Sequence, residues 1–212
     1  MAKPRLKGRM CMKKNSAEAL EGFPETANEK KDLPQDLREG QALWYVIQVR
    51  TGTEENIRIQ CEKFIQDKTI METCFIPYYE EKKRFQGRWN LEKKILFPGY
   101  IFIITRNAAE LHEALKKVMG LTKILGVGDT MIPLTAKEVA FMERFGGPRQ
   151  IVGMSEGIIE GSQIIITSGP LQGLEGYIKK IDRHKRKAWV ELPMFGRMQK
   201  VEVGVEIVRK TV

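Results

Sequence analysis

Cysteine and histidine are scarce in this chain of 212 residues, which has three cysteines and two histidines. Cys11, Cys61 and Cys74 are odd in number and widely spaced, and none belongs to a CxxC pair. This pattern predicts neither a disulfide framework nor a zinc site. With only His112 and His184, a histidine-centred metal site or acid–base pair is not expected either. We therefore expect no metal and no cofactor.

Long apolar runs are absent as well. The longest candidate covers residues 100–105, which is strand length, whereas a helix needs roughly 18 to 20 apolar residues to cross a bilayer. The amino end has no apolar signal-peptide core. The sequence thus predicts a cytoplasmic protein without a membrane segment.

Features of an enzyme are also missing. Gly169, Gly173 and Gly176 have neither the spacing of a phosphate loop nor a helix pattern after them. The carboxylates show no partnered acid–base arrangement. We expect no catalytic residue and no enzymatic activity.

Acidic residues are almost absent where basic residues gather. Positions 179–187, which we call the basic segment, contain a single acid, Asp182, and have Trp189 just beyond them. The formal net charge is +9, and residues 157–212 carry ten basic and six acidic residues, the largest excess of any part of the chain. Such a distribution favours nucleic acid as the partner. The basic residues are Lys179, Lys180, Arg183, His184, Lys185, Arg186 and Lys187.

Two plainer interpretations stay open for these residues. The basic segment could be a solvated loop whose charges only aid solubility. Trp189 could stack on a base, or it could close one end of a small barrel.

Short strand patterns dominate the carboxy-terminal part, residues 158–212. Residues 163–167, 175–181, 188–192 and 201–203 are β-branched or alternate apolar with polar side chains, as half-buried strands do. An SH3-like all-β barrel is the most economical core for strands this short. The basic segment then lies mostly at a hairpin tip.

Residues 42–146 predict an α+β domain. Strands are expected at 43–49, 75–77, 95–105 and 122–127, with a charged hairpin at 80–88 and an interruption at Pro98 and Gly99. Capping-box spacings at 51–54, 107–110 and 135–138 each predict a helix start. This order suggests an antiparallel four-stranded sheet with helices against it. Residues 1–41 are predicted to be a disordered extension, and residues 147–157 a linker.

Four motifs together resemble the NusG family of transcription elongation factors over residues 43–212. In that family the first domain is the NGN domain and the second is the KOW barrel. The motifs are Trp44-Tyr45-Val46, Phe97-Pro98-Gly99-Tyr100, Gly169-Pro170-Leu171-Gln172-Gly173 with Gly176, and Met194-Phe195-Gly196-Arg197.

The resemblance implies that the NGN domain binds RNA polymerase at the clamp helices of its largest subunit. The matching positions are Trp44, Tyr45, Phe97, Pro98, Gly99 and Tyr100. Trp44 and Phe97 could also be ordinary core residues, whereas a bulge at Pro98 would aim the Tyr100 ring outward. Non-template DNA is a further candidate partner, and a monomer is expected.

The basic hairpin tip resembles the LoaP branch of the family, whose members are processive antiterminators with a KOW domain that binds an RNA hairpin. By this resemblance the RNA-binding residues are the basic segment, Trp189 and Arg197. Leu171 stands where the general factor has an aromatic residue that contacts a ribosomal protein or Rho, so a ribosomal contact is in doubt. The alternatives are a general NusG-type elongation or pausing factor and a ribosome-associated protein with a KOW module.

Overall fold

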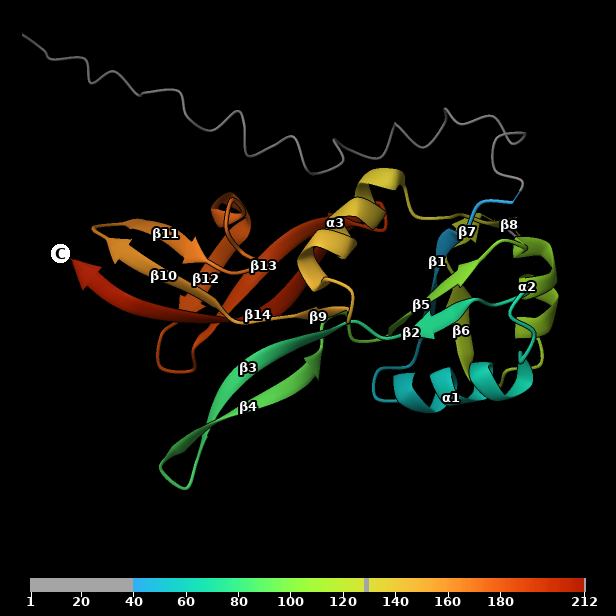
Figure 1. The fold of residues 1–212 in the computed structure, drawn as a ribbon, viewed down its shortest axis with the longest axis horizontal. Helices are drawn as coiled ribbons and strands as arrows, with labels where there is room; N and C mark the ends of the chain where they lie inside the picture. Colours follow the sequence, from blue (N-terminus) through green and yellow to red (C-terminus); the bar gives the residue numbers. More distant parts are fainter. Residues whose placement is uncertain (1–39, 128–129, 212) are drawn as a thin grey trace, which may run out of the picture.

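The computed structural model describes residues 40–127 and 130–211, which form two packed domains (Figure 1). The predicted extension, residues 1–41, lies outside the described residues except for its last two. We call residues 40–152 the N-terminal domain and residues 155–211 the C-terminal domain.

A four-stranded sheet with strand order β2-β5-β1-β6 forms the centre of the N-terminal domain. All of its pairs are antiparallel; Tyr45 and Cys74, for example, both lie opposite Ile103. This confirms the predicted antiparallel sheet. Its strands are β1 (Leu43–Val49), β2 (Thr73–Phe75), β5 (Tyr100–Thr105) and β6 (Leu121–Ile124), and a ribbon of β7 (Gly126–Val127) and β8 (Thr130–Met131) follows.

The two faces of this sheet bury different helices. Side chains alternate along β1, so Ile47 lies on the face covered by α1 (Glu54–Phe64) and α2 (Ala108–Leu115). Val46 lies on the other face, in a core that also contains Phe141 and Phe145 of α3 (Ala136–Gly146). In Figure 1, α3 lies between the sheet and the C-terminal domain. The second face is therefore the one that meets the rest of the molecule.

Two of the three predicted capping boxes behave as helix caps. Thr135 and Glu138 cap α3 reciprocally, and the Asn107 side chain accepts a hydrogen bond from the Glu110 amide at the start of α2.

The predicted box at residues 51–54 is wrong, because the N-cap of α1 is Thr53 and its side chain makes no capping hydrogen bond. The buried Glu54 carboxylate instead accepts hydrogen bonds from the amides of Gly52 and Gly99, each at 2.7 Å. Glu54 thus ties the start of α1 to the turn that precedes β5.

The charged hairpin forms a separate sheet. It consists of β3 (Tyr78–Phe85) and β4 (Arg88–Ile95), with β9 (Ile151–Val152) parallel to β3. The sequence predicted one interrupted strand over residues 95–105, but the chain turns at Pro98 and Gly99 and changes sheets. The hairpin closes through Gln86 and Gly87, which both have positive φ, and it extends away from the N-terminal sheet (Figure 1).

The C-terminal domain is a five-stranded barrel sheet with order β11-β10-β14-β13-β12. Ala188, Val190 and Leu192 of β13 alternate into its core, as the sequence predicted. The strands are β10 (Ser155–Glu160), β11 (Gln163–Ser168), β12 (Ile178–Asp182), β13 (Lys187–Met194) and β14 (Arg197–Thr211). The predicted strand at 175–181 begins instead with a short 3-10 helix, Glu175–Tyr177, and the predicted linker contains β9 and the start of β10.

Candidate functional site

An aromatic cluster lies on the face of the N-terminal sheet that meets α3. Trp44 contacts Phe75 edge-on with ring centroids 5.2 Å apart, and Phe75 stacks on Phe102 at 5.4 Å. Phe97 follows β4 and tilts against Phe102 at 6.0 Å. With Tyr100, the first residue of β5, these rings make up what we call the aromatic cluster.

The structure brings together only part of the predicted polymerase-binding set. Trp44, Phe97 and Tyr100 belong to the aromatic cluster, while Gly99 is buried in the turn beside the exposed Pro98. Strand alternation places Tyr45 on the opposite face of the sheet, away from Trp44. Trp44 and Phe97 are 8% and 2% exposed, so in this conformation both rings are core, which was the plainer of the two interpretations.

The aromatic cluster is covered by the tip of the β13–β14 hairpin. The Phe195 ring lies 5.3 Å from Phe97, 5.2 Å from Tyr100 and 5.7 Å from Phe102, centroid to centroid. Phe195 and Gly196 form the two-residue turn and both have positive φ, an unfavourable backbone region for a bulky residue such as Phe195. The turn directs the Phe195 ring at the other domain.

Polar contacts hold the same tip. The Phe195 amide donates to Oε1 of Glu138 at 2.8 Å, while Oε2 of this carboxylate accepts from the Thr135 amide in the α3 capping box. Arg197 donates a hydrogen bond to the Tyr100 hydroxyl, and its guanidinium lies 5.8 Å from the centre of that ring. The expectation that Tyr100 points outward is wrong here, because its exposed fraction is 6%.

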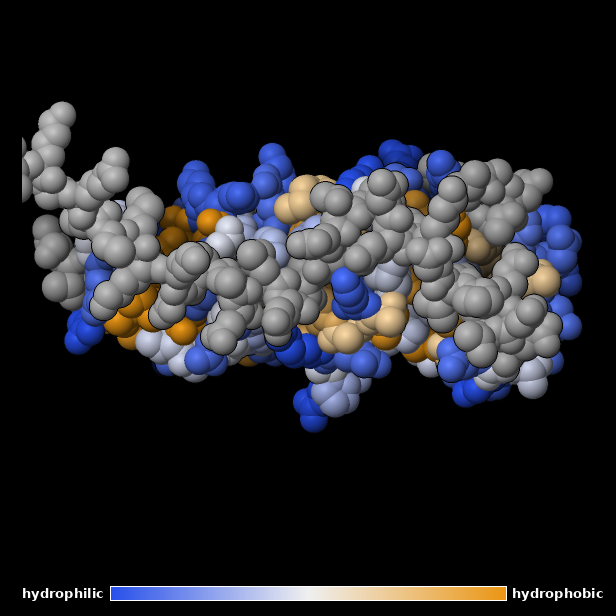
Figure 2. All heavy atoms as spheres, turned by 90° about the horizontal axis from the view of Figure 1, so that it is seen from above, coloured by the Kyte–Doolittle hydropathy of each residue, from blue (hydrophilic) through white to orange (hydrophobic). Residues whose placement is uncertain are grey.

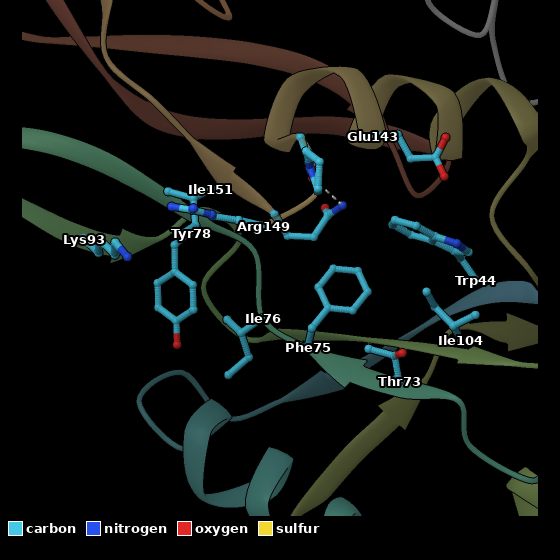
Figure 3. Close-up of a pocket in the computed structure, with 13 residues that line it drawn as sticks. Trp44, Thr73, Phe75, Ile76, Tyr78, Lys93, Ile104, Glu143, Arg149 and Ile151 are labelled. Carbon is cyan, nitrogen blue, oxygen red and sulfur yellow. Dashed lines mark hydrogen bonds between the residues drawn. The ribbon is translucent and has the colours of Figure 1, made fainter. Parts of the chain in front are cut away.

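An open groove of about 750 Å³ leaves one edge of the aromatic cluster accessible (Figure 3). Trp44, Phe75 and Ile104 contribute apolar side chains to it, Glu143 lies near Trp44, and Arg149 lies across from Trp44, near Ile151. The groove borders β2, which is one of the two edge strands of the sheet.

A second interdomain contact joins β14 to β3. Gly204 allows the close approach, because a Cβ at this position would lie 2.3 Å from the Glu80 carbonyl oxygen. The Tyr79 hydroxyl lies 3.4 Å from Glu81 and 3.3 Å from Glu202, and could donate to either carboxylate. Burial raises the pKa of Tyr79, and the two carboxylates raise it further. The hydroxyl therefore stays protonated and can donate across the interface.

The basic segment divides into an exposed part and a part that faces the N-terminal domain. Lys179 and Lys180 are exposed on β12, and Arg183, His184 and Lys185 form the exposed turn before β13. Lys179 lies 3.7 Å from Glu191. Within residues 40–127 and 130–211, no ion pair involves the side chains of Lys180, Arg183 or Lys185. These three cations remain available to a ligand.

Arg186 and Lys187 are paired with acids of the protein itself. Arg186 lies 2.9 Å from Glu206, and Lys187 lies 2.7 Å from Glu202 and 3.6 Å from Glu81. Burial alone would lower the pKa of Lys187, but the two carboxylates outweigh it and raise that pKa. Burial would likewise raise the pKa of Glu202, yet hydrogen bonds from Lys187 and Trp189 leave it lowered. Of these pairs, only the one between Lys187 and Glu81 crosses the interface between the domains.

Trp189 lies on the outer face of β13, since the buried residues of that strand are its even-numbered neighbours. Its indole Nε1 donates to Glu202 at 2.9 Å, and the Lys180 ammonium lies 5.1 Å from the ring centre. The ring therefore does not close the barrel core, which was one of the two interpretations. Arg197, also predicted to bind RNA, instead contacts the aromatic cluster.

Sequence reasoning missed the residues that join the domains. Phe195 was quoted only as part of a family motif, and its ring turns out to cover the aromatic cluster. One partner of Lys187, Glu81, lies in the other domain, whereas Glu202 and Glu206 lie on β14 of the same domain. A signal was available on the β3–β4 hairpin, where residues 82–89 hold four basic and two aromatic residues.

The described residues contain no group of three or more His, Cys, Asp or Glu side chains that could hold a metal ion. Cys61 and Cys74 are free and buried, and both belong to the core on the α1 side of the N-terminal sheet. Across the same part of the chain, no helix is both long and apolar enough to span a membrane.

Comparisons with known proteins match both domains. The family model described as "Transcription termination factor nusG" matches residues 42–143. The proteins named "Transcription termination/antitermination protein NusG" of Staphylococcus aureus strains Mu50 and N315 are each 28% identical over 178 residues, which cover 81% of this chain and 97% of theirs. A solved structure titled "Domain interaction in Thermotoga maritima NusG" is 21% identical with a TM-score of 0.49, covering 77% of this chain and 94% of that one. The family model thus matches the N-terminal domain, and the NusG proteins of Staphylococcus aureus are similar to this chain across both domains.

Proposed function

We propose that this chain is a specialised transcription elongation factor of the antiterminator type. It binds RNA polymerase through the N-terminal domain and a hairpin of the nascent transcript through the C-terminal domain. The observation that carries the proposal is the exposed end of the barrel, where Lys180 of β12 and Arg183 and Lys185 of the following turn have no ion pairs among the described residues.

RNA binding follows from the chemistry of that turn. Cations on a protruding turn can follow the phosphates of an A-form stem, whose shape and backbone are what proteins mainly recognise. Arg186 and Lys187 contribute less than the sequence suggested, because Glu206 and Glu202 already neutralise them. About three phosphate contacts remain, which corresponds to a log–log salt slope of roughly −2 to −3.

Polymerase binding uses the aromatic cluster. The groove beside Trp44 and Phe75 offers an apolar edge to an incoming helix, and full access requires that Phe195 leave the cluster. A partner that binds only the uncovered state has an apparent affinity reduced by the fraction of molecules in that state. Linking the two binding domains then lets modest contacts combine.

The RNA interface is tested by reversing two charges, Arg183→Glu and Lys185→Glu, in the full-length protein. We expect the affinity for an end-labelled RNA stem-loop to fall and the salt slope to lose about 2 of its magnitude. Arg209→Glu is the matched control, because Arg209 is exposed near the end of β14, where it pairs with Glu160 and not with the basic segment. Equal affinity and slope in all proteins would refute RNA binding by the turn.

Antitermination is tested by transcription in vitro on templates that carry a leader hairpin upstream of a terminator. Transcript ends mapped with and without the protein should shift beyond the terminator, and the shift should disappear with the doubly reversed variant. Unchanged transcript ends with the wild-type protein would exclude an antiterminator on those templates.

A general NusG-type factor is the second candidate. The relatives that match over 97% of their length are named for termination as well as antitermination. Such a factor would act on polymerase without selecting one RNA. Equal effects on templates with the native leader and with scrambled hairpins would favour this second function.

A further inference from the structure

The β3–β4 hairpin carries exposed cationic and aromatic side chains that neither proposed interface uses. Three of the large exposed apolar residues lie on it, namely Phe85, Trp89 and Leu91, which are 61%, 39% and 55% exposed. On the face of the molecule in Figure 2, by comparison, apolar residues lie in separate patches among hydrophilic ones. Arg84 and Arg88 flank the hairpin turn and are also exposed.

The strand register assigns these residues to opposite faces. Arg84 pairs with Trp89 across the two strands, so the two side chains share one face. Phe85 pairs with Arg88 on the other face. The hairpin therefore presents one arginine on each side.

The face with Arg84 and Trp89 adjoins the basic segment of the other domain. The Arg186 guanidinium lies 3.8 Å from the centre of the Trp89 ring, an Arg–aromatic stack. Lys82, two residues before Arg84 and on the same face, reaches Glu206, which is also the partner of Arg186. The turn of residues 183–186 is thus held against this side of the hairpin.

Arg84 is a cation on this face that no acid of the described residues neutralises. Lys82 is paired with Glu206, whereas no ion pair in the described part of the chain involves Arg84. A strand residue with an unpaired guanidinium beside a basic turn adds to the positive potential there. Electrostatically, such a site suits a polyanion.

We propose that Arg84 and Trp89 form a second RNA contact, which continues the phosphate-binding surface of the basic turn across the domain boundary. This inference rests on the proposed RNA-binding function. Arg84 binds backbone phosphate, and the exposed part of the Trp89 ring, which Arg186 holds in place, stacks on an unpaired base of the RNA loop. Aromatic stacking tolerates any base, while the arginine fork fits a phosphate.

The experiment compares Arg84→Ala with Arg88→Ala in the full-length protein, because both remove one exposed arginine from the same hairpin. Binding of an end-labelled RNA stem-loop is measured by fluorescence anisotropy over a range of salt concentrations. We expect Arg84→Ala to weaken binding about fivefold near 0.15 M salt and to reduce the slope by about 1. Arg88→Ala should stay within about twofold of wild type. Circular dichroism melts check that both variants fold.

Other outcomes overturn the inference. If Arg84→Ala binds the RNA stem-loop as tightly as the wild-type protein does, the inference is wrong. If Arg84→Ala and Arg88→Ala lose the same affinity, the hairpin attracts RNA only through its overall charge and holds no specific site. Equal binding of a DNA stem-loop of the same sequence, with the same loss in Arg84→Ala, shows that the ligand class is wrong. Failure of the proposed function gives a different result. The wild-type protein would then bind no stem-loop, or the Arg183→Glu and Lys185→Glu reversals would leave the affinity unchanged.

Discussion

Replacing Phe195 with alanine should detach the hairpin tip from the aromatic cluster. The substitution removes ring contacts with Phe97, Tyr100 and Phe102 at 5.2 to 5.7 Å. Burying a phenylalanine side chain contributes about 1.5 to 3 kcal/mol, and aromatic pairs add about 0.5 to 1.5 kcal/mol. Because Phe195 is only half-buried, we expect about 2 to 3 kcal/mol for the contact, a factor of roughly 30 to 150 in the docking equilibrium.

Amide hydrogen exchange measures this change directly. The amide of residue 195 donates to Glu138 in the docked state, so its protection should fall by the same factor in Phe195→Ala. Met198→Ala is the matched control, because Met198 is on the same hairpin and 53% exposed, and its exchange should match wild type. The affinity for polymerase should rise in Phe195→Ala, because more molecules have an uncovered aromatic cluster. The rise cannot exceed the factor by which the substitution changes the docking equilibrium. Unchanged protection at residues 194–197 would refute the assignment of the ring as the main contact.

Three further predictions concern the interface. Glu138→Ala removes both the α3 capping box and the acceptor of the Phe195 amide, so urea unfolding should show a loss of about 2 to 3 kcal/mol. Gly204→Ala places a methyl group against the Glu80 carbonyl, and should cost about 1 to 3 kcal/mol of unfolding free energy or separate the domains, as small-angle scattering would show. Acid should loosen the interface. The pKa values of Glu81 and Glu202 are lowered by Lys94 and Lys187, against the effect of burial, so their contribution is complete above the ordinary glutamate pKa of about 4.3 and is lost as pH falls below it. The protection factors of the β14 amides, which correct for the intrinsic pH dependence of exchange, should fall in that range and not between neutral pH and about pH 5.

Local chemistry determined much of the fold. The capping residues Thr135 and Asn107 specified two helix starts because their bonds close within three residues. The alternation of Ala188, Val190 and Leu192 specified a barrel strand, because a half-buried strand has a period of two. The sequence alone also located the exposed cations Arg183 and Lys185, in a segment whose single acid is Asp182.

Contacts between distant parts of the chain were decided only by the tertiary structure. The carboxylate of Glu54 was expected to cap its own helix, but it bonds to the Gly99 amide 45 residues away. Lys187 looked like a free cation until folding placed it beside Glu81 of the other domain. A charge pattern shows where the cations are. Which of them stay unpaired, and so can bind an anionic ligand, depends on the acids that packing brings within 4 Å. For the same reason, the family resemblance pointed to aromatic positions on one domain, and only the folded chain showed that Phe195 covers Phe97 and Tyr100.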